Sequence, residues 1–206
     1  MLSSSQQFQV VLASASPARL ATLRAAGLDP SVLVTGADEE SVRAESPAAL
    51  VAALAELKAD AAQDALHPAQ GPTLLLACDS MMELDGEPIG KPGSEQQAVQ
   101  LWQRMRGREA LLHTGHVVRL LGDGAPASLT RVATTLVRFA DLGDEEVRAY
   151  AGTGEPARVA GGFAIDSLAG PFVERIEGDY HNVVGISLPL LRTMLGELGI
   201  GWTELW

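Results

Sequence analysis

Short apolar runs bounded by polar or turn residues recur along the chain, and they predict the strands of a sheet. Residues 8–13 and 73–78 have the length and composition of buried strands. Two longer runs, 113–121 and 128–139, are predicted to be strands joined by a turn at Gly122-Asp123-Gly124. Asp85-Gly86 lies between two half-apolar stretches and predicts a hairpin.

Other segments carry apolar residues at helical spacing, and three of them begin at a residue that caps helices. Ser16 and Ser46 each stand before a proline, which suits the first helical position. Ser94 and Gln97 form a capping box. The predicted helices cover residues 17–26, 47–61, 94–105, 144–150 and 187–198.

The alternation of strands and helices predicts an α/β fold, with a mixed sheet flanked by helices. The glycine-rich segment 152–170 is predicted to be irregular, with one strand at 163–165. No internal repeat or low-complexity linker divides the chain. We therefore expect one domain over residues 1–206, formed by two lobes packed around a central cleft.

Composition and charge limit the functions that such a domain can have. The chain has 206 residues with a net charge of −11, which argues against binding a nucleic acid polymer. Its single cysteine excludes a disulfide framework, and its apolar runs are too short to span a membrane. Because the first residues lack a basic region, we expect no signal peptide and a cytoplasmic protein. Any anion site must therefore use locally placed basic groups.

One such place is the segment from Ser14 to Arg19, between the first predicted strand and the first predicted helix. Ser14, Ser16, the free N–H groups of the helix start and the Arg19 guanidinium together suit an anion. The spacing matches neither a Walker A loop nor GxGxxG. An ordinary capped helix with a surface arginine explains the same residues.

Three further charged residues lie where a site would use them. Lys58 falls inside the apolar arc of its helix, where it either snorkels or holds an anion. Asp79 follows a predicted buried strand, at the edge of an α/β sheet where ligands gather, and is a candidate metal ligand or general base. Lys91, in Gly90-Lys91-Pro92, can bind a phosphate. The acidic run at 38–40 is by itself more typical of a solvated surface.

The order and combination of these motifs resemble the Maf family, from Val11 to about Leu195. The motifs are LASASPAR (12–19), ADEE (37–40), LKA (57–59), CDSM (78–81), GKP (90–92), HTGHV (113–117), GEPARVAGGFAID (154–166) and GDYHNVVGISLP (178–189). The resemblance implies an α/β fold with a cleft, a homodimer, and hydrolysis of a nucleoside triphosphate to the monophosphate and pyrophosphate with Mg²⁺ or Mn²⁺.

Residue by residue, the resemblance points to a common site. It implies Ser14, Ser16, Arg19, Lys58 and Lys91 on the substrate phosphates, Glu39 and Asp79 on the metal, and Asp79 as the proton acceptor. An enzyme is favoured because a protein that only binds nucleotides needs no carboxylate to activate water. The family name keeps open the alternative of a nucleotide-binding regulator of cell division without significant turnover.

Three positions depart from the usual family pattern where substrate choice is thought to be set. Ala18 replaces an arginine, Ser80 replaces a threonine, and Asp166 replaces a glutamine. An ionised Asp only accepts hydrogen bonds, so Asp166 favours a base edge rich in donors, guanine-like or cytosine, over thymine or uracil. The alternative is that Asp166 faces solvent or caps a glycine-rich loop. A lysine of the family pattern is here Val159, with Arg158 one residue earlier.

Overall fold

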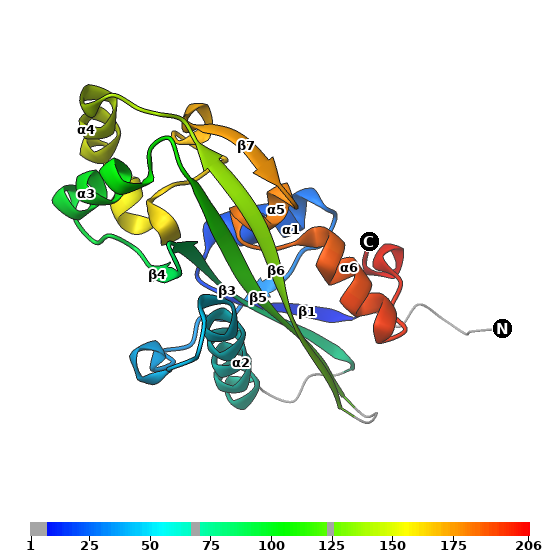
Figure 1. Ribbon diagram of the computed structural model, residues 1–206. Coiled ribbons are helices and arrows are strands. Elements are labelled where there is room, and N and C mark those ends of the chain that lie inside the picture. Colours follow the sequence, from blue (N-terminus) through cyan, green and yellow to red (C-terminus); the bar gives the residue numbers. More distant parts are fainter. Residues whose placement is uncertain (1–7, 67–70, 123–125) are drawn as a thin grey trace.

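A seven-stranded mixed sheet runs through the protein (Figure 1). The computed structural model describes residues 8–66, 71–122 and 126–206. The strands are β1 (Gln9–Ala13), β2 (Ser31–Val32), β3 (Thr73–Leu84), β4 (Glu87–Ile89), β5 (Glu109–Leu121), β6 (Ala127–Phe139) and β7 (Val173–Glu177). Their order is β2-β1-β3-β5-β6-β7, with β4 also paired to β3, and the predicted α/β class is confirmed.

The sheet has a parallel part and an antiparallel part that meet at β3. β1 is parallel to both β2 and β3, whereas the pairs β3–β5, β5–β6 and β6–β7 are antiparallel. The predicted hairpin at Asp85-Gly86 joins β3 to β4, and both residues have positive φ angles, 58° and 80°, as a tight turn requires. Two residues of the turn predicted between β5 and β6, Asp123 and Gly124, lie outside the described residues.

One edge of β3 is left open between two partners. β1 pairs with residues 73–77 of β3, and β4 pairs with residues 82–84 on the same side of that strand. On the opposite side, β5 pairs continuously with residues 73–83. Residues 78–81 therefore pair with β5 on one side, and on their other side the sheet has a gap between β1 and β4.

The expectation that Asp79 ends its strand is wrong, because β3 continues to Leu84. Polar residues after Cys78 alternate with apolar ones, and the pairing with β5 carries the strand on. Asp79 thus lies in the middle of a strand, at the gap.

Within the described residues, six α-helices pack on this sheet, and the caps predicted for three of them are present. The hydroxyls of Ser16, Ser46 and Ser94 accept hydrogen bonds from the backbone N–H three residues ahead. The helices are α1 (Pro17–Ala25), α2 (Pro47–Ala65), α3 (Glu95–Met105), α4 (Asp144–Gly152), α5 (Tyr180–Val184) and α6 (Leu188–Glu197). None of the helices within the described residues has the length and apolarity that crossing a membrane demands.

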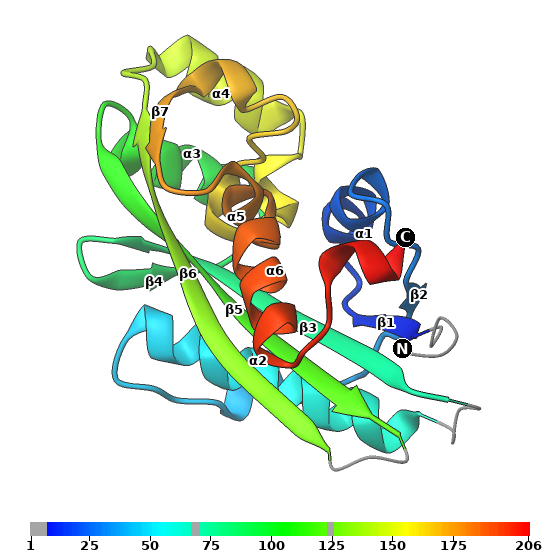
Figure 2. The ribbon, with the colours of Figure 1, turned by 90° about the vertical axis from the view of Figure 1, so that its right-hand side faces the viewer.

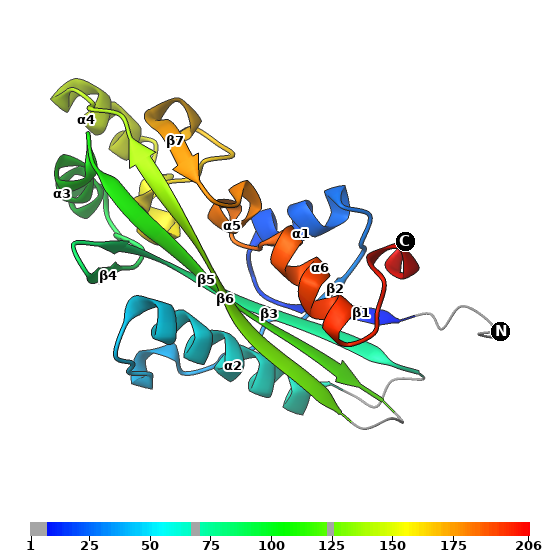
Figure 3. The same cartoon turned by 45° about the vertical axis from the view of Figure 1, so that its right-hand side comes forward.

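The helices divide into three groups around the sheet (Figures 2 and 3). α2 covers one face through small residues such as Ala55 and Ala59, against Leu75 and Val117. α1 and α6 cover the other face at the β1 end. α3 and α4 pack with the far end of β5 and β6 around Trp102, which is fully buried. The open edge of β3 lies between these groups.

The strand predicted at 163–165 is wrong. Gly161 and Gly162 both have φ near +70° and lie against Met82 and Leu101, so the chain turns here instead of extending. Phe163 is buried by an edge-to-face contact with Phe139, 4.9 Å between ring centroids, rather than by strand pairing. The segment instead forms the short 3₁₀ turns η2 (Pro156–Arg158) and η3 (Ala160–Gly162).

Candidate active site

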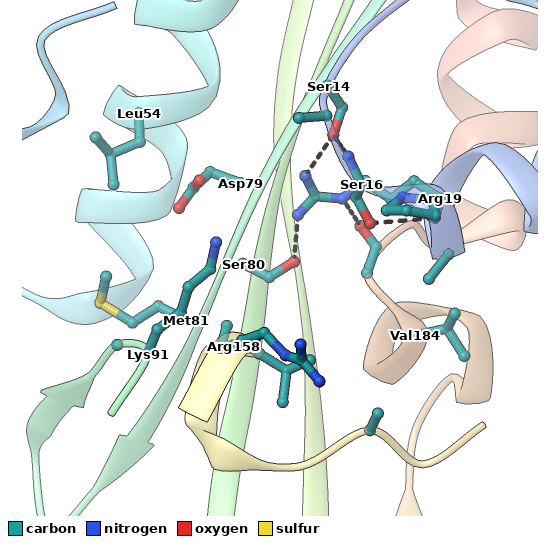
Figure 4. A pocket seen from close by; sticks show the side chains of 18 of the residues that line it. Ser14, Ser16, Arg19, Leu54, Asp79, Ser80, Met81, Lys91, Arg158 and Val184 are labelled. Atoms are coloured by element: carbon teal, nitrogen blue, oxygen red, sulfur yellow. Dashed lines mark hydrogen bonds between the residues drawn. The ribbon is translucent and has the colours of Figure 1, made fainter. Parts of the chain in front are cut away.

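A cavity of about 660 Å³ opens at the gap in the sheet. Its walls come from the end of β1, the start of α1, the middle of α2, the open edge of β3, the loop after β4, the η2–η3 segment and the end of α5. All of the site residues predicted from the sequence line it: Ser14, Ser16, Ala18, Arg19, Glu39, Lys58, Asp79, Ser80, Lys91 and Asp166. Several of these side chains are visible in Figure 4.

Lys58 joins the two predicted metal-binding carboxylates. Its Nζ lies 2.5 Å from Oδ1 of Asp79 and 3.1 Å from Oε1 of Glu39. The side chains of Lys58 and Asp79 are only 17% and 12% exposed, whereas that of Glu39 is 49% exposed. Lys58 therefore forms an ion pair inside the cavity and does not snorkel to the surface.

The close approach of α2 to the sheet brings Lys58 to Asp79. Gly115 of β5 is the cross-strand partner of Asp79, and a Cβ on it would lie 2.2 Å from the carbonyl oxygen of Val51 in α2. Lys58 comes two helical turns after Val51, on the same face of α2. A glycine at position 115 is therefore what lets the helix lie this near to the strand.

Arg19 is buried and bound mainly by the protein itself, at 8% exposure. Its Nε donates to the Gly185 carbonyl (2.7 Å) and its Nη1 to both the Ser14 hydroxyl (3.0 Å) and the Cys78 carbonyl (2.9 Å). Its Nη2 donates to Ser80 Oγ at 2.8 Å. A guanidinium has five N–H donors, so this arrangement leaves a single N–H for a ligand. The alternative interpretation of Arg19 as an ordinary surface arginine is thus wrong.

The serines around Arg19 keep donors for a ligand. Ser14 Oγ accepts from the Ser16 N–H as well as from Arg19, and Ser16 Oγ accepts from the Arg19 N–H. Because these hydroxyl oxygens act as acceptors, their O–H groups remain available to an anion. Ser80 Oγ also pairs with Thr114 Oγ1 at 2.9 Å.

Lys91, Asp166 and Arg158 also face this cavity, from loops on its other side. Within residues 8–66, 71–122 and 126–206, none of their charged groups makes a hydrogen bond or ion pair. Arg158 is not among the site residues predicted from the sequence, although it lies inside the motif at 154–166. Its displacement by one residue from the lysine of the family pattern was the signal that could have identified it.

Two buried groups near the cavity are unsuited to proton transfer at neutral pH. Burial raises the pKa of the Cys78 thiol to about 11, so this thiol stays protonated. Burial lowers the pKa of His116 to about 4, so its ring stays neutral. No histidine is found among the described residues that line the cavity. Its candidate bases are therefore carboxylates, and Asp79 is the most enclosed of them.

Comparison with known proteins agrees with the order of these motifs. The family model described as "Maf-like protein" matches residues 9–198. A nucleoside triphosphate pyrophosphatase of Salinispora tropica is 50% identical over all of this chain and 90% of its own length. One of Streptomyces avermitilis is 50% identical over 96% of this chain and 94% of its own.

Among solved structures, the Ham1 protein of Staphylococcus aureus is similar to this chain with a TM-score of 0.41 and 21% identity, over 65% of this chain and 72% of that one. The family match covers far more of the chain, including every position that lines the cavity. The chain therefore belongs to the family of Maf-like proteins.

Proposed function

We propose that this protein is a nucleoside triphosphate pyrophosphatase, which hydrolyses a standard or modified nucleotide to the monophosphate and pyrophosphate. Relatives of about 50% identity over nearly the whole chain carry that name. The observation that carries the proposal is the enclosed Asp79 carboxylate, whose partner Lys58 also pairs with Glu39, in a cavity that presents other cationic side chains as well. A site that only held a nucleotide would need the cations but not this carboxylate.

Asp79 is the general base of the proposed reaction. It accepts a proton from a water molecule as the water oxygen forms a bond to the α-phosphorus. The bond between that phosphorus and the bridging oxygen to the β-phosphorus breaks, and pyrophosphate leaves with the bonding electrons. A phosphate beside Lys58 competes with Asp79 for the ammonium, which frees carboxylate oxygen for this role.

The remaining polar groups bind the triphosphate. Lys58 and Lys91 supply charge, and the hydroxyls of Ser14 and Ser16 with the N–H groups at the start of α1 supply donors. Arg19 contributes its one free N–H, and its four internal hydrogen bonds fix the wall formed by Ser14, Cys78, Ser80 and Gly185. We thus assign Arg19 more to the shape of the site than to direct binding.

The carboxylates of Glu39 and Asp79 fit a divalent cation that arrives with the nucleotide. Mg²⁺ is commonly bound by one or two carboxylates together with substrate phosphates. In the part of the chain that the structure describes, no three His, Cys, Asp or Glu side chains converge as a metal cage would require. When bound, such an ion would polarise the phosphoryl oxygens and offset their charge. We therefore propose Mg²⁺ or Mn²⁺ as the cofactor, held only weakly without nucleotide.

Calorimetry tests this coupling directly. Mg²⁺ titrated into the free protein is expected to give little heat, and a non-hydrolysable triphosphate analogue is expected to bind at least about tenfold more tightly with Mg²⁺ than with EDTA. Glu39→Gln should reduce that difference. Equal affinity of the analogue in both buffers would contradict the proposal.

For base selection we propose Ala18, Ser80 and Asp166, which all line the cavity. The Asp166 carboxylate has no bonding partner within the described residues and is exposed toward the cavity, so it can accept two adjacent N–H donors from a guanine-like edge or one amine from cytosine. The small side chain of Ala18 leaves space for a larger base. The preferred substrates are therefore expected to carry a donor-rich edge.

The decisive experiment is a pyrophosphate-release assay on standard and modified triphosphates, each with Mg²⁺ and with EDTA. Turnover that yields the monophosphate and pyrophosphate in equal amounts supports the proposal. Tight nucleotide binding without turnover would support the regulator of cell division instead. We also propose a homodimer in the cytoplasm; sedimentation velocity of the purified protein and fractionation of its host cells test these two points.

A further inference from the structure

Among the described residues, four cationic side chains line the cavity: Arg19, Lys58, Lys91 and Arg158. They differ in how many of their hydrogen bonds and ion pairs are already made within the protein. Arg19 donates four hydrogen bonds to protein atoms, and Lys58 is held by two carboxylates. Lys91 and Arg158 make no ion pair or side-chain hydrogen bond with any residue that the structure describes. Arg158 thus lines the cavity with a guanidinium whose donors have no partner among the described residues.

Backbone hydrogen bonds hold Arg158 beside Lys91. The Gly93 N–H donates to the Ala157 carbonyl at 3.0 Å, and the Gly161 N–H donates to the Gly90 carbonyl at 3.1 Å. These two bonds join the loop that carries Lys91 to the η2–η3 segment that carries Arg158, one on each side of both residues. Figure 4 shows the two side chains entering the cavity from these neighbouring segments.

Glu155 braces the segment from its other side. Its Oε1 accepts a hydrogen bond from the Tyr150 hydroxyl at 2.8 Å, and its Oε2 accepts one from the Ser167 hydroxyl at 2.6 Å. Tyr150 is itself buried in α4. The backbone at Arg158 is therefore fixed relative to the cavity, while its side chain remains free to meet a ligand.

We propose that Arg158 binds the polyphosphate of the substrate together with Lys91, and that the two residues form an anion clamp opposite Lys58 and Asp79. A guanidinium can hold two phosphate oxygens at once, whereas an ammonium acts as a point charge. The clamp would therefore bind the β- and γ-phosphates, the part of the substrate that leaves as pyrophosphate. This inference rests on the proposed function for its substrate, but its chemistry requires only a polyphosphate.

Binding of inorganic tripolyphosphate, measured by calorimetry, tests the clamp without any turnover. Arg158→Ala is expected to weaken tripolyphosphate binding by about tenfold or more, as loss of a charge-assisted pair should. Arg158→Lys should recover part of that loss, because it restores charge but not the two-point contact. Arg148→Ala is the matched control: Arg148 is an exposed arginine on α4 outside the cavity, and its loss should leave binding unchanged.

Kinetics separate this role from base recognition. If the clamp exists, Arg158→Ala raises KM by a similar factor for every nucleotide of the panel and weakens inhibition by pyrophosphate in parallel. A KM change confined to some bases, or unchanged tripolyphosphate binding in a folded Arg158→Ala protein, would overturn the inference. If the wild type binds tripolyphosphate through Arg158 but hydrolyses no nucleotide, the clamp stands and the proposed function fails.

Discussion

Lys58 Nζ lies 2.5 Å from Asp79 Oδ1, and this ion pair joins the middle of α2 to the open edge of β3. Both side chains are largely enclosed, so the pair is screened less than one at the surface. A strand supplies the carboxylate and a helix supplies its counter-charge. The central group of the candidate site is thus held by two elements of regular structure.

Asp79→Asn is expected to reduce the rate of pyrophosphate release by at least about a hundredfold, because an amide accepts no proton from water. Asp64→Asn serves as control, since Asp64 is exposed on α2 and lies outside the cavity. Circular dichroism melting should show both variants folded. A folded Asp79→Asn protein with near-normal turnover would end the assignment of the base.

Gly115→Ala tests whether the approach of α2 controls the site. Its new Cβ would meet the Val51 carbonyl at 2.2 Å, so α2 must move outward. The free energy of unfolding should fall by about 1–3 kcal/mol, and turnover should fall as Lys58 leaves Asp79.

Gly196→Ala is the control for that variant. Apart from its own helix backbone and chain neighbours, no described residue comes within 4 Å of the position that its Cβ would take on α6, so stability should stay the same or rise by up to about 1 kcal/mol. Urea unfolding of both variants decides the matter. If Gly115→Ala and the wild type have equal free energies of unfolding, α2 can move outward without loss of stability, which would contradict the prediction.

The sequence predicted the elements with strong local signals, including the capped helices α1, α2 and α3 and the long strands β5 and β6. It missed the continuation of β3 beyond Cys78, because that segment is extended by its pairing with β5 rather than by an apolar run. Residues 173–177 were likewise unassigned: β7 is a polar edge strand that depends on β6 for its hydrogen bonds.

The residues of the candidate site were likewise predicted from sequence motifs. In the structure they line one cavity. The sequence did not reveal which cationic side chains of the site already bind other groups of the protein. Three of the four hydrogen bonds of the Arg19 side chain, and the backbone bonds that place Arg158 beside Lys91, join residues far apart in the chain. Such contacts depend on tertiary structure and leave no periodic pattern in one sequence.

Arg19→Lys should destabilise the fold as well as weaken catalysis. A lysine cannot reach the separate acceptors that the guanidinium joins, so buried groups lose partners at a cost of about 1–3 kcal/mol each. Arg24→Lys is the control on the same helix, because the Arg24 side chain is exposed and, among the residues that the structure describes, pairs only with Asp29. Thermal melting and kcat/KM over several nucleotides provide the readout. A change of base preference with kcat/KM preserved for the best substrate would place Arg19 in base recognition instead.

His116 makes stability depend on pH. Its ring is buried, and its Nε2 accepts from the Ser187 N–H, which a protonated ring could not do, so the folded protein holds the ring neutral although its Nδ1–H donates to the Thr114 carbonyl. Burial lowers its pKa to about 4 in the fold, from an ordinary value of about 6.5. The unfolded chain therefore binds a proton first as pH falls, and the contribution of this group to stability declines between pH 6.5 and about 4, by about 3 kcal/mol in all.

An NMR titration of the His116 ring measures that pKa directly, and urea unfolding at pH 7 and pH 5 measures its effect. The pH dependence of stability should be smaller in His116→Gln, which carries no titrating group. A His116 resonance that titrates near pH 6.5 in the folded protein would contradict the prediction.

Asp166→Gln should shift base preference toward dTTP and UTP, because a glutamine supplies both a donor and an acceptor to those base edges. The ratio of kcat/KM for GTP-like and dTTP-like substrates should change by about tenfold, the cost of leaving a polar group unpaired. Melting should not change, since Asp166 has no bonding partner in the described structure. A wild type that already prefers dTTP, with the same preference in the variant, would refute this role.

The interruption of the sheet beside β3 divides the site into parts that differ in how firmly they are anchored. Asp79 lies on a strand whose other edge is paired with β5 over eleven consecutive residues, 73–83, so its backbone belongs to the most cooperative unit of the fold. Glu39, Lys91 and Arg158 come from short turns and loops. Amide hydrogen exchange should therefore be slowest along the β3–β5 ladder and should slow at these loops when nucleotide binds. We expect the proposed general base to stay in place while the loops that carry the other groups become less mobile on binding.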